Sequence, residues 1–453
     1  MNKYAVLALA ATIMVLVSTG RATAAADGLP AVPLSLIEAT DMAIKARPDL
    51  FLEIEKTKLA VSRVKQARGN FLPTLDFLAT NSYVKSYDSF TGIDISARIA
   101  GQNISVTIDK NVPSYQLNDE LSFDLNLYAG GRDSALLGEA EENLQSARHQ
   151  EGATERKVRL EVARAYWELK KAHLRYAMAK RELELVRMEM EVAATEHRVD
   201  RRSEVEYDAV VLKGREKEVA LKTMDRDCLR AFSHNLHVVG MEDKGSLPSA
   251  EQIPRLTDDP DSETNSAEGI SDHPDILRLE AELHAAQART EAARAENLPK
   301  IDLVARHSLI GRDSSSLWDA WGDTQADNSM IGLRLSMNLF NGFRTEERIN
   351  QAEAEVRIKK LQLVQKKREI TEAENVRKTA LETARDQLSL ALAHEKLEAA
   401  REKAAGSQLQ SGRISQLEYR QRVANVENAA DQVLMAKIEV ALAGNALEFL
   451  VLE

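Results

Sequence analysis

The chain has a single cysteine, Cys228, among 453 residues. One cysteine excludes an intrachain disulfide and a cysteine-rich metal cluster. The nine histidines show no HExxH motif and no paired metal-ligand spacing, and no phosphate-binding glycine loop or Ser/His/Asp set stands out. The sequence therefore predicts no cofactor, no metal and no catalytic residue, and it disfavours an enzyme.

Positive charge is also in deficit, since the formal net charge is −11 at pH 7. An acidic chain without a basic stripe does not favour nucleic acid as a partner. A highly charged surface of this sign suits a structure that encloses or faces water.

Long apolar runs are confined to the first residues. Ala5–Val17 is an apolar run of 13 residues between Lys3 and a set of small residues. It is too short to span a bilayer as a helix, which takes about 20 residues. The pattern predicts a signal peptide over residues 1–26, with an uncleaved anchor as the alternative. No later stretch approaches this hydrophobicity over 18 residues, so any membrane insertion requires a closed barrel.

Proline is absent from two large blocks, residues 114–247 and 300–453. Because proline breaks helix interiors, its absence allows long uninterrupted helices in both blocks. Between the blocks, residues 240–272 carry three prolines and many aspartates and serines. This composition predicts a linker.

The two blocks are copies of one unit. The segment from Arg47 to Pro73 aligns without gaps to the segment from His273 to Pro299, at an offset of 226 positions. Further along, Leu125–Gly130 matches Met337–Gly342 at an offset of 212, and so do the serines Ser203 and Ser415. We therefore divide the chain into a first repeat at 27–239, a linker at 240–272 and a second repeat at 273–453.

Each copy is predicted to contain a helix of about 20 residues, a strand, a glycine-rich loop and a second strand. The second strands alternate apolar and polar residues. Their apolar positions are Leu121, Phe123, Leu125 and Leu127 in the first copy, and Ile331, Leu333, Leu335, Met337 and Leu339 in the second. This alternation is typical of a barrel with lipid outside and water inside. A half-buried strand of a soluble sheet has the same pattern, and both alternatives stay open at this point.

A long helix and a shorter one follow the strands. Arg344–Gln410 is predicted as one helix of 67 residues, about 100 Å at 1.5 Å per residue. Ser415–Leu450 is predicted as the shorter helix. Stacked end to end with the helix of about 20 residues, it nearly matches the length of the long helix. Helices of this length need neighbours, which indicates oligomerisation. In the shorter helix a coiled-coil seam is predicted at Val423, Val426, Ala430, Val433, Lys437, Val440, Gly444 and Leu447.

Several short segments resemble the outer-membrane efflux (TolC) family. They are Leu34–Ala39 with Arg47–Asp49, Phe71–Pro73, Leu127–Arg132, Leu339–Arg344 and Ser411–Ser415. The resemblance covers essentially the whole chain after the signal peptide. It implies a mainly α fold with a β-barrel portion, built from long antiparallel helical hairpins that form an α-barrel. Each protomer would give four strands to a 12-stranded trimeric barrel in the outer membrane.

The resemblance also implies a function and partners. The homotrimer would be the passive exit duct of a tripartite efflux or type I secretion system, in contact with outer-membrane lipid. Its helices would lie in the periplasm and meet a periplasmic adaptor, which links the duct to an inner-membrane pump of the ABC or RND type. The alternatives are a periplasmic adaptor, which would have one hairpin with lipoyl-like domains, and a structural coiled-coil protein. The strands and the glycine breaks disfavour both.

The candidate site lies at the two hairpin tips. Ser203 with Glu206, and Ser415 with Glu418, have the spacing of a capping box. By resemblance, Glu418 matches an acidic position of the family's closed periplasmic end through its distance from Gly412. The tip residues carried over are Glu418, Glu206, Arg413, Gly412, Ser415 and Ser203. A second acidic position of the family falls on Gln421, which departs from the pattern.

Two smaller features complete the sequence-based expectations. Asp200 stands where the second tip has Gly412, and aspartate tolerates the left-handed backbone that such a turn requires. Trp318 and Trp321 lie in the loop between the strands of the second copy. They are interpreted either as membrane-interface aromatics or as packed residues of a loop tip.

Overall fold

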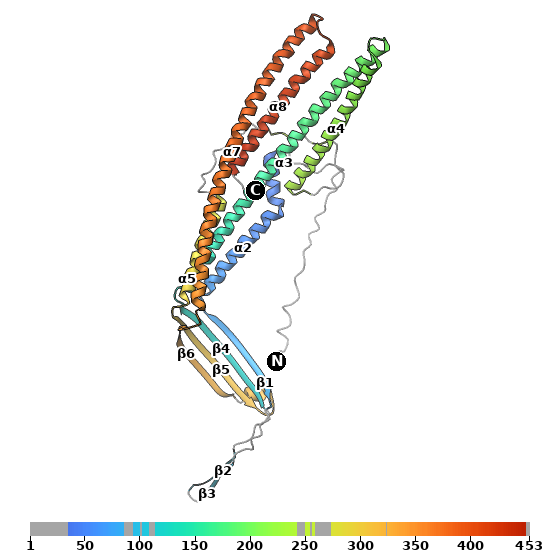
Figure 1. The fold of residues 1–453 in the computed structure, drawn as a ribbon. Coiled ribbons are helices and arrows are strands. Elements are labelled where there is room, and N and C mark those ends of the chain that lie inside the picture. Colours follow the sequence, from blue (N-terminus) through green and yellow to red (C-terminus); the bar gives the residue numbers. More distant parts are fainter. Residues whose placement is uncertain are drawn as a thin grey trace.

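The computed structural model describes residues 35–85, 94–99, 102–107, 114–241, 250–253, 256–258, 273–322 and 324–449. The described part is elongated, with a β-sheet at one end and two helical hairpins that extend to the other (Figure 1). The signal peptide predicted over 1–26 lies outside the described residues, as does much of the linker. The division into repeats and linker therefore stays a prediction.

One antiparallel sheet contains four strands in the order β1 (Thr74–Val84), β4 (Ser114–Tyr128), β5 (Lys300–Asp313) and β6 (Thr324–Ser336). The two copies contribute two strands each and join where β4 pairs with β5. The fold class predicted from the sequence, mainly helical with four strands, is confirmed. β4 and β6, the second strands of the two copies, begin earlier in the chain than the alternation indicated, because each starts with a stretch of more polar residues.

The loops between the strands contain structure that the sequence did not predict. The loop of the first copy carries a separate hairpin of β2 (Asp94–Ile99) and β3 (Gln102–Thr107). The loop of the second copy carries the short helix α6 (Leu317–Gly322), which contacts β5 and β4. The repeat offset falls from 226 to 212, so the first copy has 14 residues more, and these fall between its two sheet strands, in the loop that holds the β2–β3 hairpin.

The helices of the two copies have matching lengths. α2 (Pro48–Gly69) and α5 (Pro274–Ala295) each have 22 residues, and α3 (Arg132–Arg198) and α7 (Arg344–Gln410) each have 67. α2 and α5 begin on Pro48 and Pro274, because proline at the first helical position leaves no N–H without a partner. The predicted 67-residue helix is confirmed to the residue.

Each long helix pairs with two shorter ones, as predicted. α3 contacts α2 and α4 (Glu204–Val239), while α7 contacts α5 and α8 (Gln416–Phe449). α3 also contacts α5 and α8, so the central helix of the first copy holds the second copy in place. A further helix, α1 (Leu36–Ala46), packs against α3 and α4 near the middle of the molecule.

The main hydrophobic core surrounds the middle of α3. Tyr166 and Trp167 are buried there in an edge-to-face contact, with ring centroids 5.2 Å apart. Ala43 of α1, Phe232 of α4 and Ile438 of α8 complete the same cluster. Because four helices meet at this point and nowhere else among the described residues is the core comparably thick, this cluster holds the two hairpins together.

The seam predicted along α8 is only partly correct. Val433 and Gly444 are buried, but Ala430 is exposed. A coiled-coil seam presumes one partner helix, whereas α8 packs against both α7 and α3. Two partners widen and shift the buried face, which consists of Ala424, Ala429, Val433, Ile438, Ala441 and Gly444.

Candidate functional sites at the hairpin tips and on the sheet

The tip between α7 and α8 brings its predicted residues together as a capping box. The Ser415 hydroxyl oxygen accepts a hydrogen bond from the backbone N–H of Glu418 at 3.2 Å. In return, Oε2 of Glu418 accepts from the Ser415 N–H at 2.8 Å. Each side chain thus satisfies a backbone donor that the first turn of a helix leaves without a partner. Both residues are exposed.

Gly412 and Arg413 close the preceding helix. The Gly412 N–H donates to the carbonyl of Leu409, and the Arg413 N–H donates to the carbonyl of Gln408, both at 2.9 Å. This pair of bonds is a Schellman motif, which needs a left-handed residue just past the helix. Gly412 has φ +70°, which glycine adopts without steric cost. Arg413 therefore closes the turn through its backbone, and its side chain is exposed.

The tip between α3 and α4 repeats this geometry with a different residue. Asp200 takes the place of Gly412 and has φ 57°, so the expectation of a left-handed aspartate is confirmed. Ser203 and Glu206 form a complete capping box. The hydrogen bonds from Ser203 hold the pKa of Glu206 below its usual value, because they favour the carboxylate.

The two tips differ in how their helices are tied together. At the first tip, the rings of His197 and Tyr207 stack, with centroids 5.2 Å apart. At the second tip, the equivalent Tyr419 instead donates a hydrogen bond to Glu402. The tips lie apart from one another in one protomer (Figure 1), so Glu206 and Glu418 do not form one cluster. The gate role of Glu418 stays a prediction.

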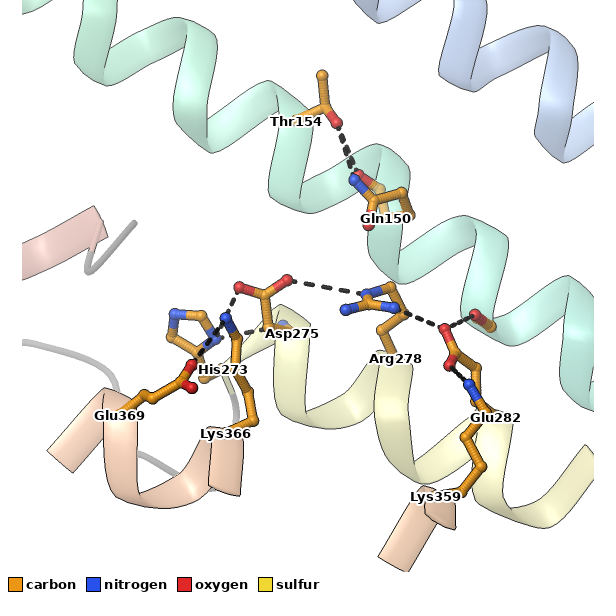
Figure 2. Close-up of polar contacts among 10 residues, drawn as sticks. Gln150, Thr154, His273, Asp275, Arg278, Glu282, Lys359, Lys366 and Glu369 are labelled. Atoms are coloured by element: carbon orange, nitrogen blue, oxygen red, sulfur yellow. Dashed lines mark hydrogen bonds and ion pairs between the residues drawn. The ribbon is translucent and has the colours of Figure 1, made fainter. Parts of the chain in front are cut away.

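A polar junction between the two copies was not found from the sequence. Glu282 of α5 accepts hydrogen bonds from Arg278 at 2.6 Å and from Lys359 of α7 at 2.7 Å (Figure 2). Burial alone raises the pKa of Glu282, but the hydrogen bond from Lys359 and the two positive charges outweigh it and lower the pKa. Ser146 of α3 also reaches Glu282, so three helices meet on one carboxylate.

A second polar link joins α3 to α8. Lys171, a buried lysine, pairs with Glu439 at 2.8 Å and with Glu168 at 2.6 Å. Arg181, farther toward the tips, contacts Asn428 and Asp431 of α8. The i, i+4 spacing of Arg278 with Glu282 and the i, i+3 spacing of Glu168 with Lys171 were the sequence signals for these links, since partners on other helices have no fixed spacing.

The sheet has one apolar face and one polar face. The strand register places Leu75, Phe123, Ala305 and Ile331 in one row across all four strands. Ile331 is 77% exposed, and Phe77, which lies in the next row, is 67% exposed. On the opposite face Arg334 pairs with Asp124 at 3.4 Å and Arg306 with Glu120 at 3.6 Å. Such a sheet matches the lipid and water sides of a membrane strand.

Among the described residues, no helix is both long and apolar enough to cross a lipid bilayer.

Similar folds occur in solved membrane proteins. A membrane protein from Pseudomonas aeruginosa superimposes with a TM-score of 0.71 at 20% identity, over 92% of this chain and 93% of that one. The CmeC outer membrane channel of Campylobacter jejuni gives a TM-score of 0.70 at 16% identity, over 92% and 85%. At these identities the likeness shows the fold alone, a strand sheet joined to long helical hairpins.

The sequence comparisons identify the family. The family model "Outer membrane efflux protein" matches residues 39–205 and 268–451, and the chain belongs to this family. Protein CyaE of Bordetella pertussis is 25% identical over 327 residues. That match covers 71% of this chain but 64% of CyaE, less than two thirds of the relative's length.

Family membership confirms two predictions. The protein is located in the outer membrane, and its large helical part lies in the periplasm. The family consists of channel and transport proteins, which favours the duct over the periplasmic adaptor and the structural coiled coil. With this orientation, we expect the helix tips at the inner end and α6 at the end facing the cell surface.

Proposed function

We propose that three copies of this chain form the exit duct of a tripartite efflux or type I secretion system. The observation that supports this proposal is that the sheet is open at both edges and exposes an apolar face. Its outer strands β1 and β6 each have one neighbour in the described sheet, and its apolar face is exposed. Open edges in lipid leave backbone groups without partners. Three copies of four strands supply 12, which fits the even strand numbers of bacterial barrels.

The helices complete the duct. Two hairpins per protomer, each with a 67-residue helix, would form a periplasmic α-barrel of six hairpins in the trimer. A helix of 67 residues is about 100 Å long, which suits a conduit across the periplasm rather than a compact domain. Many acidic and basic side chains along these helices favour a water-filled interior.

The proposed partners follow from this architecture. We expect the hairpin tips to meet a periplasmic adaptor, and the adaptor to connect the duct to an inner-membrane pump of the ABC or RND type. Because the pump supplies the energy, the duct itself needs no catalytic residue, and we propose that the chain is not an enzyme. Glu418 is proposed as part of the gate at the periplasmic end, in addition to its capping role.

Fractionation and electrophoresis test the proposal. The full chain should appear in the outer-membrane fraction as a trimer in unheated samples and as a monomer after boiling. Single-channel recordings on the purified protein should show conductance across a planar bilayer. A monomeric protein in the soluble periplasmic fraction would contradict the proposal.

A further inference from the structure

The short helix α6 carries two exposed tryptophans on one side. Trp318 and Trp321 are 84% and 55% exposed, whereas Ala320 between them is fully buried. Residues three positions apart lie on the same side of a helix. The helix therefore rests on the sheet through Ala320 and turns both indole rings away from it.

The position of Gly311 shows which face of the sheet α6 covers. The Ala320 carbonyl occupies the space where a Cβ at Gly311 would lie, and the Leu117 Cβ is 3.6 Å from the same point. Leu117 pairs with Gly311, just as Phe123 pairs with Ala305. Because alternate residues of a strand share a face, Leu117 and Phe123 lie on the same face. The helix therefore lies on the apolar side of the sheet.

Polar residues enter this face of the sheet before it reaches α6. His307 and Ser329 follow in the next row outward, with Nδ1 of His307 3.0 Å from the Ser329 hydroxyl and 3.5 Å from Asp327. Gly311 lies four positions beyond His307 on β5. At about 3.3 Å per residue and a strand tilt of about 40°, this is about 10 Å farther along the membrane normal. That depth is near the outer boundary of the interfacial layer, which is about 5–8 Å thick.

The opposite end of the sheet gives an independent measure of depth. Phe340 and Phe343, both exposed, contact each other edge to face where β6 leads into α7. Eleven positions separate Ser329 from Phe340. β6 ends at Ser336, so with the same rise and tilt these positions span at most about 28 Å, comparable with the hydrocarbon thickness of about 30 Å. The apolar rows thus fill the bilayer core, and α6 lies just outside it.

We propose that α6 is an interfacial anchor, with Trp318 and Trp321 inserted among the lipid headgroups of the outer leaflet. The inference rests on the proposed outer-membrane duct and adds a lipid contact to it. Indole rings favour this layer because their apolar body faces the acyl chains while the N–H remains near polar groups. The contact lies on the same face of the sheet as the apolar rows and directly outward of them, which favours lipid over a second protein as the occupant.

Fluorescence quenching by brominated lipids tests the anchor in the full-length trimer. The chain has three tryptophans, and the third, Trp167, is buried in the periplasmic core. In proteoliposomes, bromine near the headgroups should quench the emission more strongly than bromine near the chain ends. The variant Trp318→Phe/Trp321→Phe should lose this quenching and remain a trimer on unheated gels.

A matched control separates the anchor from the duct. Leu333→Trp in the double-phenylalanine background reports the apolar rows, because Leu333 is exposed and lies four positions inward of Ser329 on β6, and it should be quenched best by deep bromine. Quenching of the Leu333→Trp variant without quenching of the wild-type α6 tryptophans would overturn the anchor and leave the duct intact. Strongest quenching of the α6 tryptophans by deep bromine would also overturn the headgroup position. Absence of quenching in every protein would contradict membrane insertion, and with it the proposed function.

Discussion

The hydroxyl of Tyr419 on α8 donates a hydrogen bond of 2.8 Å to Oε1 of Glu402 on α7. This bond raises the pKa of Tyr419, so the phenol stays a neutral donor beyond its usual range. In the first copy, Tyr207 occupies the equivalent place but stacks on His197. The duplicated tips therefore share a backbone turn and differ in the contact that closes it.

We expect Tyr419→Phe to loosen the second tip, because phenylalanine cannot donate to Glu402. Backbone amides of residues 403–420 should exchange faster with deuterium. Tyr207→Phe is the matched control, since the stacked ring remains and exchange at the first tip should not change. Equal responses of both tips would show that the Tyr419–Glu402 bond does not hold the hairpin.

Glu418→Gln should raise the conductance of the closed duct and weaken its block by divalent cations. Three copies of Glu418 around a trimer axis would repel one another and bind cations, and glutamine removes that charge while it still caps the helix. Ser415→Ala is the control, because it weakens the cap but keeps the carboxylate. Single-channel recordings with and without divalent cations distinguish the two roles. If Glu418→Gln behaves like wild type, Glu418 is a helix cap only.

Glu282→Gln should weaken the junction of α3, α5 and α7. Loss of two charge-assisted hydrogen bonds should lower the free energy of local opening of α5 by about 2 kcal/mol, measured by hydrogen exchange. Glu355→Gln is the control, because Glu355 is exposed and pairs with Arg289 at 3.1 Å. This variant should change the free energy of local opening of α5 by less than about 0.5 kcal/mol.

The same junction should depend on pH. The pKa of Glu282 is lowered from 4.5 in the folded chain, so its contribution is complete above that value and disappears as the pH falls through the lowered pKa. The difference between wild type and Glu282→Gln should therefore be constant from neutral pH to about pH 5.5 and vanish in acid. A difference that persists below the lowered pKa would contradict the ionic origin.

Gly311→Val should displace α6 from the sheet, because its side chain would occupy the space of the Ala320 carbonyl. We expect faster proteolysis within residues 313–322 and retention of the trimer. Gly332→Val on β6 is the control, since no atom lies within 4 Å of a Cβ there. Unchanged cleavage in Gly311→Val would mean that α6 does not depend on this contact.

Much of the fold could be predicted from local patterns. The absence of proline and the repeat offset together located the 67-residue helices, because helix length depends on an uninterrupted run of helix-compatible residues. The alternation around Phe123 and Leu333 indicated a two-faced sheet. At the tips, Ser203 with Glu206 and Ser415 with Glu418 have a spacing that by itself brings each pair within hydrogen-bond distance.

Contacts between segments far apart in the chain were decided only by the tertiary structure. The meeting of Ser146, Glu282 and Lys359 has no sequence signal, because three helices must first pack before their side chains can share a carboxylate. The buried face of α8 was misjudged for the same reason, since it depends on α3 as well as on α7. The position of α6 on the sheet depends on the absence of a side chain at Gly311 and on the pairing register of β4 with β5. The sequence by itself determined the long helices and the two-faced strands, while long-range packing decided which of their faces are covered.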